Sequence, residues 1–186
     1  MGRTKALFVL ALCFLCSCPG EEQPPAPAPG AGAKPVTVTS KAFPEGATMP
    51  KPYTADGADL SPPLAWKGVP EGTKSLALVC DDPDAPRGTW VHWVLWNLPP
   101  ETRELPEGVP AEEVLKSGAK QGKNDFGKVG YNGPAPPRGS PHRYYFKLYA
   151  LDTVLNLAPG ATKKQLLEAM GSHVLAQGQL MGKYQR

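Results

Sequence analysis

The chain has 186 residues, of which 23 are proline and 20 are glycine, and its formal net charge is +3. This length fits a single domain, and the proline and glycine content indicates many turns. Without the first 17 residues, which include Arg3 and Lys5, the formal charge falls to +1. Because nucleic-acid-binding domains usually have a pI above about 9, this charge argues against nucleic acid as a partner.

The N-terminal residues have the pattern of an export signal. Two basic residues precede an apolar run at 6–15, which is too short to span a bilayer as a mature helix. The sequence LCSC at 15–18 resembles the bacterial lipobox, whose cysteine becomes the diacylated N-terminus of a lipoprotein. We therefore expect 1–17 to be a lipoprotein signal peptide and Cys18 to anchor the exported protein to a membrane of the cell envelope. The alternative is an ordinary cleaved signal, which would leave a soluble exported protein.

A proline-, glycine- and alanine-rich tether is expected at 18–35, where almost no apolar residue is larger than alanine. The globular pattern begins at Val36, so the domain is expected to span 36–186. Cys80 is the only cysteine in that domain, which excludes an intrachain disulfide there. We expect Cys80 to be a buried thiol, with a catalytic nucleophile as the weaker alternative.

Five segments of the domain have strand patterns. The alternating, β-branched sequence at 36–40 favours an edge strand. The segments 75–82 and 90–98 are apolar at successive positions, which is typical of strands covered on both faces. Aromatic residues are frequent at 144–152, and a closing strand is predicted at 179–184. These segments predict a mainly β domain.

Helical signals are fewer. A capping box begins at Thr162, and the apolar residues after it predict a helix that stops near Gly178. A short helical turn is predicted at 111–117. The segment 118–141 consists mostly of glycine, proline, lysine and asparagine, so a long loop is expected there, and such loops are usually functional.

Two short stretches concentrate the residues that carry chemistry. CDDPDAPRGTWVHW at 80–93 places carboxylates, prolines and an imidazole at the end of a buried strand, and HRY at 142–144 begins the aromatic strand. Residues two apart in a strand share a face. Trp90 and His92 are therefore expected on one face of their strand, and His142 and Tyr144 on one face of theirs. If the strand ends converge, one pocket is expected to be lined by Asp82, Asp84, Trp90, His92, His142 and Tyr144.

Such a pocket suits a small phosphorylated or otherwise anionic ligand. Imidazoles donate hydrogen bonds to an anion, and we expect His92 and His142 to do so while Asp82 orients one of them. Trp90 and Tyr144 would form the wall of the pocket. Binding should then strengthen towards acid pH as the histidines become protonated.

The order of these motifs resembles that of a known family. DDPDAP with GTWVHWVLWNLP, followed by GYNGPAPPRGSPHRYYFKLYALD, is similar to the two signature blocks of the phosphatidylethanolamine-binding protein family, in its bacterial Raf-kinase-inhibitor-like branch. LSPPLAW and the C-terminal GSHVLAQGQLMGKYQR also resemble that branch. The resemblance extends from about Val36 to the C-terminus. It implies a large antiparallel sheet packed beside a smaller sheet, with one or two helices.

The resemblance also implies a set of ligand-binding residues without any cofactor. The DPDAP aspartate, the Trp-x-His pair and the HRY motif of the family's anion pocket match Asp82, Trp90, His92, His142 and Tyr144. A loop that supplies backbone donors matches Gly133 to Pro137, with Ala135 where many eukaryotic members have a second glycine. Asp84 is expected to support the turn.

Two further features of the family carry expectations for the backbone. The Ala-Pro bond of DPDAP is cis in the family, so Ala85-Pro86 is expected to be cis. The chain ends just after Tyr184, so we expect no counterpart of the C-terminal helix that borders the pocket in mammalian members.

We expect a binding protein and not an enzyme, and three alternatives remain. Two aspartates and two histidines could hold a divalent metal for hydrolysis, but no compact ligand motif is present. A triad of Ser140, His142 and Asp82 lacks the Gly-x-Ser-x-Gly elbow. An inhibitor of a protease or kinase could act through a protein-binding surface, with a partner that the sequence does not identify. Kinase inhibition itself is not carried over from the family.

Four residues outside this set have expectations of their own. We expect His173 to be a hydrogen-bonded structural histidine and Trp93 and Trp96 to lie in the core. Arg143 is expected either to pair with a nearby carboxylate or to contact the ligand.

Overall fold

The structure, a computed structural model, describes residues 27–28 and 34–186. The predicted signal peptide, Cys18 and most of the tether lie outside these residues. Within the described part of the chain, no helix has the length and apolar character needed to cross a membrane. The elements in chain order are β1 (Thr37–Thr39), η1 (Lys51–Tyr53), β2 (Leu64–Lys67), β3 (Ser75–Asp82), β4 (Trp90–Leu98), β5 (Glu104–Leu105), β6 (Lys120–Gln121), β7 (His142–Leu151), α1 (Lys163–Met170), η2 (Gly171–His173) and β8 (Val174–Tyr184).

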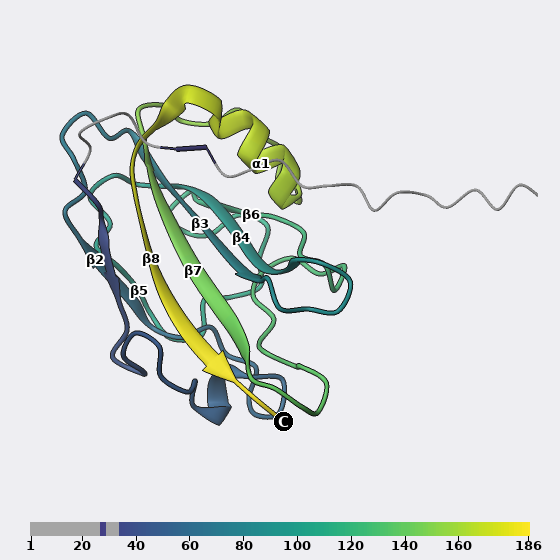
Figure 1. Cartoon of the computed structure of the whole chain (residues 1–186). Coiled ribbons are helices and arrows are strands. Elements are labelled where there is room, and N and C mark those ends of the chain that lie inside the picture. Colours follow the sequence, from purple (N-terminus) through teal and green to yellow (C-terminus); the bar gives the residue numbers. More distant parts are fainter. Residues whose placement is uncertain (1–26, 29–33) are drawn as a thin grey trace, which may run out of the picture.

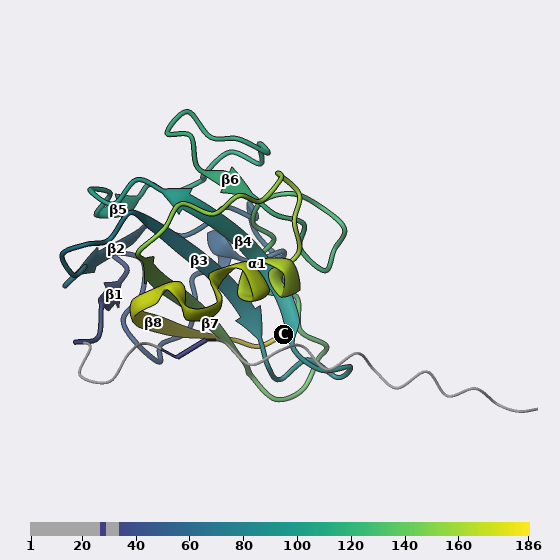
Figure 2. The same ribbon diagram turned by 90° about the horizontal axis from the view of Figure 1, so that it is seen from above.

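Two antiparallel sheets make up the domain (Figure 1). The smaller sheet has the strand order β1-β2-β5, and the larger has the order β6-β4-β3-β7-β8. The helix α1 packs over the face of the large sheet that is turned away from the small sheet (Figure 2). This arrangement confirms the predicted mainly β fold, with a large antiparallel sheet beside a smaller one.

The central strands of the large sheet are buried on both faces. Leu78 of β3 belongs to the core that joins the two sheets, whereas its neighbour Val79 belongs to the core beneath α1. Successive side chains of a strand point to opposite faces, so a strand covered on both sides needs apolar residues at both parities. Trp93 and Trp96 of β4 are fully buried on these two opposite faces, which confirms their prediction as core residues.

The helix begins where the sequence predicts and ends earlier. The Thr162 hydroxyl accepts a hydrogen bond from the backbone N–H of Gln165, and the Gln165 side chain accepts one from the Thr162 N–H, which completes the capping box. The prediction that the helix continues to Gly178 was wrong, because α1 ends at Met170 and β8 starts at Val174. From there the backbone pairs with β7, and that pairing overrides the local helical pattern.

Two further differences concern short elements. No helical turn forms at 111–117, because Gly118, with φ +85°, reverses the chain and lets Val114 bridge to Lys120 in antiparallel fashion. The strands β2, β5 and β6 were not predicted, since four or two residues are too few for an alternation to be recognised. The segment 118–141 is the expected long loop, interrupted by β6.

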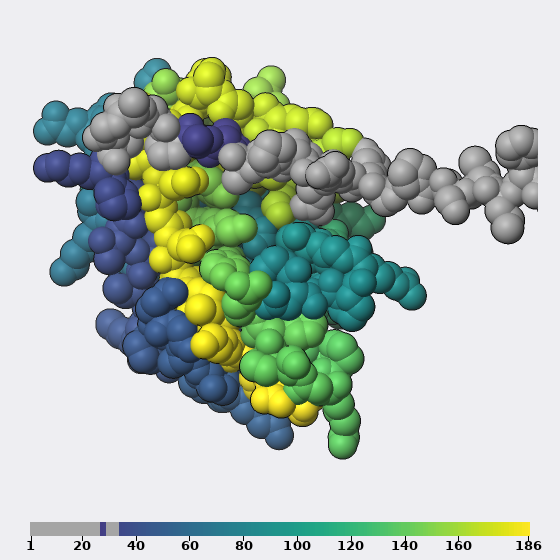
Figure 3. Space-filling view, in the orientation of Figure 1, coloured from purple at the N-terminus to yellow at the C-terminus, as the bar shows by residue number. Residues whose placement is uncertain are grey.

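The chain before β1 and the C-terminal residue both pack against neighbouring segments. The Val36 N–H donates to the Gln177 carbonyl at 3.0 Å, and a Cβ at Gly178 would lie 1.8 Å from the Val36 oxygen, so this approach requires glycine. At the other end of β8, the guanidinium of Arg186 pairs with the Asp56 carboxylate at 2.7 Å. Figure 3 shows these C-terminal residues in yellow, between blue and green segments of the chain.

Candidate functional site

A cavity of about 320 Å³ opens where β3 ends and where β4 and β7 begin. Antiparallel pairing brings these ends together, because Asp82 is opposite Trp90 on one side and Asp81 is opposite Tyr145 on the other. The predicted convergence of the strand ends is therefore observed. Seven of the nine predicted ligand-binding residues line the cavity: Asp82, Trp90, His92, Ala135, Pro137, His142 and Tyr144.

Asp82 holds one of the two pocket histidines in a fixed orientation. Its carboxylate oxygen Oδ2 accepts a hydrogen bond from Nδ1 of His142 at 2.7 Å, and Oδ1 accepts from the backbone N–H of Asp84 at 2.8 Å. Both Asp82 and His142 are buried. Since a carboxylate accepts here, the proton of His142 is on Nδ1 and its Nε2 is left for a ligand.

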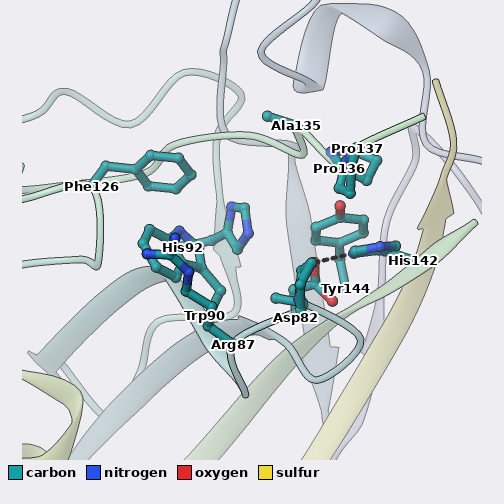
Figure 4. A pocket seen from close by; sticks show the side chains of 12 residues that line it. Asp82, Arg87, Trp90, His92, Phe126, Ala135, Pro136, Pro137, His142 and Tyr144 are labelled. Carbon is teal, nitrogen blue, oxygen red and sulfur yellow. Dashed lines mark hydrogen bonds and ion pairs between the residues drawn. The ribbon is translucent and has the colours of Figure 1, made fainter. Parts of the chain in front are cut away.

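The second histidine, His92, is held by the backbone. Its Nδ1 lies 2.6 Å from the carbonyl oxygen of Asn132, and its ring lies between the rings of Phe126 and Tyr144 (Figure 4). Burial lowers the pKa of His92, and the hydrogen bond to the Asn132 carbonyl and then the nearby carboxylates, Asp82 first among them, only partly oppose this effect. Near neutral pH the ring is therefore uncharged and its Nε2 is an acceptor. The sequence-based expectation that His92 donates to an anion holds only for the protonated ring.

The Tyr144 hydroxyl is a buried polar group without a partner. The residue is 1% exposed, and its Oη has no described partner within hydrogen-bond distance and angle, although the Asp82 carboxylate is close enough to raise its pKa. Figure 4 shows this hydroxyl directed towards Pro136 and Pro137 across the cavity. Burial, followed by the negative charge of Asp82, raises the pKa of Tyr144, so the hydroxyl keeps its proton and remains a hydrogen-bond donor.

The structure places Gly133 outside the cavity lining, although the loop that contains it forms one wall. Its backbone N–H donates to the Asp59 carboxylate at 2.6 Å, and the Asn132 side chain donates to the same carboxylate at 3.0 Å. A Cβ at Gly133 would lie 2.7 Å from the Thr54 Cα. The expected backbone donor is thus already used to anchor the loop against the segment that follows η1.

Asp84 also lies outside the cavity lining. Its carboxylate accepts hydrogen bonds from the backbone N–H, Nε and NH2 groups of Arg143. The Arg143 guanidinium lowers the pKa of Asp84 to about 2. Of the two expectations for Arg143, pairing with a carboxylate is the one observed, and Asp84 supports the turn next to the cavity.

The turn between β3 and β4 differs from the expectation in its backbone. Every peptide bond in the described residues is trans, so the prediction of a cis Ala85-Pro86 bond was wrong. The chain turns by other means: Asp82 accepts from the N–H of residue 84, and the Gly88 N–H donates to the Ala85 carbonyl at 3.1 Å. Gly88 has φ +100°, a conformation that glycine adopts without strain.

Five cavity residues are not among the nine predicted ligand-binding residues, although one of them, Pro136, lies in the predicted loop Gly133 to Pro137. They are Ala85, Pro86, Arg87, Phe126 and Pro136. Phe126 stacks edge-on against Trp90, with ring centroids 5.5 Å apart. Phe126 could have been recognised from the sequence, because it is a large aromatic residue in a loop of glycine, lysine and asparagine. Arg87 forms no hydrogen bond or ion pair with any described residue, but its sequence context did not distinguish it from a solvated arginine.

The remaining candidates lie elsewhere or are otherwise engaged. Cys80 is buried, and burial raises the pKa of its thiol, as expected for a structural cysteine. His173 lies in η2, and its Nδ1 is 2.7 Å from an oxygen of Asp152, so it is hydrogen-bonded as predicted. Among the described residues, no three His, Cys, Asp or Glu side chains are grouped so that they could hold a metal ion.

The chain is similar to known proteins over most of its length. A family model described as phosphatidylethanolamine-binding protein matches residues 39–185. A UPF0098 protein of Methanothermobacter thermautotrophicus is 53% identical over 151 residues, which are 81% of this chain and 99% of that protein. A UPF0098 protein of Aquifex aeolicus is 51% identical over 158 residues, which cover 84% of this chain and 92% of that protein.

Two solved structures are similar to this chain. The crystal structure of a phosphatidylethanolamine-binding protein homologue from Chlamydia trachomatis has a TM-score of 0.75 and 44% sequence identity, and the match covers 82% of this chain and 98% of that one. The crystal structure of YbcL from E. coli has a TM-score of 0.75 and 33% identity, with 82% and 99% of the two chains covered. That structure is described as a member of the mammalian PEBP family.

Proposed function

This chain belongs to the phosphatidylethanolamine-binding protein family, and from that premise we propose that its cavity binds small phosphate-bearing ligands without turning them over. The observation that carries the proposal is the Tyr144 hydroxyl, which is buried beside the cavity without a partner. A buried hydroxyl that lacks a hydrogen bond costs about 1–3 kcal/mol. An oxygen of a phosphoryl group in the cavity would accept that hydrogen bond.

The charges around the cavity support an anionic ligand. Arg87 lines the cavity and has no partner among the described residues, so its guanidinium is available to a phosphoryl oxygen. The Asp82 carboxylate lies 2.7 Å from Nδ1 of His142, and a protonated His142 neutralises its negative charge. When His142 takes a second proton, its Nε2 becomes another donor directed at the ligand.

The cavity lining also favours binding over catalysis. None of the described residues that line it has an aliphatic hydroxyl or a thiol, so serine-, threonine- and cysteine-type nucleophiles are missing from it. Tyr144 is the one lining residue with a hydroxyl, and its raised pKa makes it a weak nucleophile at neutral pH. We therefore assign the two histidines to ligand recognition.

We further propose that the protein is exported and held at a membrane by a lipid on Cys18. The family model begins at residue 39, and the Methanothermobacter relative is matched almost completely by 81% of this chain. The residues that carry the signal lie outside the part that the family model matches. This separation is what a removable targeting segment followed by a tether requires.

Phosphorus NMR tests binding and turnover in one experiment. Titrating the purified protein with phosphoethanolamine in the presence of a chelator should shift or broaden the ligand's resonance saturably, and no new phosphorus resonance should develop. An unchanged ligand resonance with well-folded protein would contradict the binding function and direct the search to protein partners of an inhibitor. A new resonance that appears only without chelator would identify a metal-dependent hydrolase.

A further inference from the structure

The hydrogen bonds around the two pocket histidines determine what each ring offers to a ligand. The Asn132 carbonyl oxygen has no proton to donate, so Nδ1 of His92 must carry the proton in that 2.6 Å contact. The other nitrogen of a neutral imidazole, Nε2, is then an acceptor. The same reasoning applies to His142, whose Nδ1 donates to Asp82, until that ring takes a second proton.

The surroundings of His92 keep its ring neutral. The residue is 2% exposed, and the rings of Phe126 and Tyr144 pack against it with centroids 5.3 and 5.2 Å away. Desolvation by these neighbours is the largest influence on the pKa of His92 and lowers it. The hydrogen bond to the Asn132 carbonyl opposes this effect, followed by the negative charges of Asp82, Asp125 and Asp81, but none of them is as strong as the desolvation.

The cavity therefore combines donors with a fixed acceptor. Tyr144 and Arg87 offer protons, whereas Nε2 of His92 offers a lone pair, as does Nε2 of His142 while that ring is neutral. Most of the other wall residues are apolar. A fully ionised oxygen placed against that lone pair would be repelled, and a hydroxyl would donate a hydrogen bond to it. A complementary ligand must carry both ionised oxygens and a proton.

We propose that the cavity selects phosphate monoesters in their singly protonated form over phosphodiesters and sulfate, because His92 presents a hydrogen-bond acceptor to the ligand. This inference rests on the proposed function and narrows its ligand class. A monoester has a second pKa of about 6 and therefore retains a P–OH group in mildly acidic solution. A phosphodiester, such as an intact phospholipid head group, has no P–OH group, and sulfate has none at these pH values.

Two matched ligand pairs test this selectivity by calorimetry. Phosphoethanolamine and glycerophosphoethanolamine share the ethanolamine group and differ in being a monoester and a diester, and phosphate and sulfate are matched in size. At pH 6 the protonated member of each pair should bind at least about tenfold more tightly. Between pH 6 and 8 this preference should shrink as the ligand loses its proton. The diester and sulfate keep their charge over this range, but protonation of His92 would turn its Nε2 into a donor and would also lower the ratio. The ratios are therefore compared at pH values where nitrogen-15 NMR shows the His92 ring to be neutral.

Two further measurements connect the preference to His92. In His92→Phe, which keeps a ring but has no acceptor, the ratio within each pair should fall towards one. If that variant does not fold, imidazole nitrogen-15 NMR of the wild type gives an independent result. At pH 7, Nδ1 of His92 should be protonated and Nε2 unprotonated, and the Nε2 resonance should move more with phosphoethanolamine than with the diester.

The outcomes separate this inference from the proposed function. Equal or tighter binding of the diester and of sulfate at pH 6 would overturn the monoester selectivity and leave the anion pocket in place. A His92 ring with its proton on Nε2 would overturn it as well. Failure of all four ligands to bind would overturn both the pocket function and the selectivity.

Discussion

Replacing His92 and His142 together with alanine is expected to weaken phosphoethanolamine binding by at least about 100-fold. A hydrogen bond to a charged group contributes about 1.5–3 kcal/mol, so two of them account for roughly two to four orders of magnitude in affinity. Both side chains line the cavity, and both have their Nδ1 atoms tied to protein acceptors, which directs the other nitrogen to the ligand. Calorimetric titration of the wild type and the variant measures the effect.

The third histidine provides the matched control for this experiment. His173 lies in η2 and pairs with Asp152, away from the cavity, and its side chain is 47% exposed. His173→Ala should therefore bind phosphoethanolamine as the wild type does. A folded double variant whose affinity stays within about threefold of the wild type would mean that the phosphoryl group binds outside this cavity.

Replacing Cys18 is expected to abolish lipidation of the protein completely. If that cysteine carries a diacylglycerol, the mature protein should begin at residue 18, have the mass of the lipid in addition to that of the polypeptide, and partition into detergent. Two acyl chains are sufficient for stable membrane anchoring, whereas one chain binds only marginally. Cys18→Ala removes the thiol to which the lipid is attached and should abolish the added mass completely.

Cys16 offers the matched control, because alanine is common at its position in the lipobox motif. Cys16→Ala should keep the lipid and the N-terminus at residue 18, as read by intact-protein mass spectrometry. A wild-type protein that is cleaved elsewhere and carries no lipid would contradict the anchor and support the ordinary cleaved signal.

Elements whose sequence pattern is set by burial on both faces were predicted best. The strands β3 and β4 have the bounds expected from the sequence, since burial on two sides requires a continuous apolar run that ends where the sheet ends. The helix end could not be predicted in this way. The residues after Met170 continue the apolar pattern, and only their pairing with β7, a contact distant in sequence, makes them a strand.

In the candidate site, residues in strands were also predicted better than residues in loops. Residues that belong to strands, such as Asp82, His92 and Tyr144, were placed correctly because strand periodicity fixes which side chains share a face. Loop residues could not be assigned, because their partners are far away in the sequence. The N–H of Gly133 is engaged by Asp59, 74 residues before it, and no local pattern reveals that contact.

The hydrogen-bonding role of each histidine also depends on the fold. The sequence indicates that an imidazole and a carboxylate are close, but it does not show that His92 faces a backbone carbonyl while His142 faces Asp82. This difference determines which ring nitrogen meets the ligand and whether it accepts or donates. The donor role predicted for both histidines requires protonated rings, and it stays a prediction.

A crystal structure of the protein grown with phosphoethanolamine tests the central claim, the anion pocket, most directly. The account predicts a phosphoryl group in the cavity, with oxygens within hydrogen-bond distance of the Tyr144 hydroxyl and of Nε2 of His142. It would be contradicted by a phosphoryl group bound elsewhere, or by a cavity that stays empty at saturating ligand.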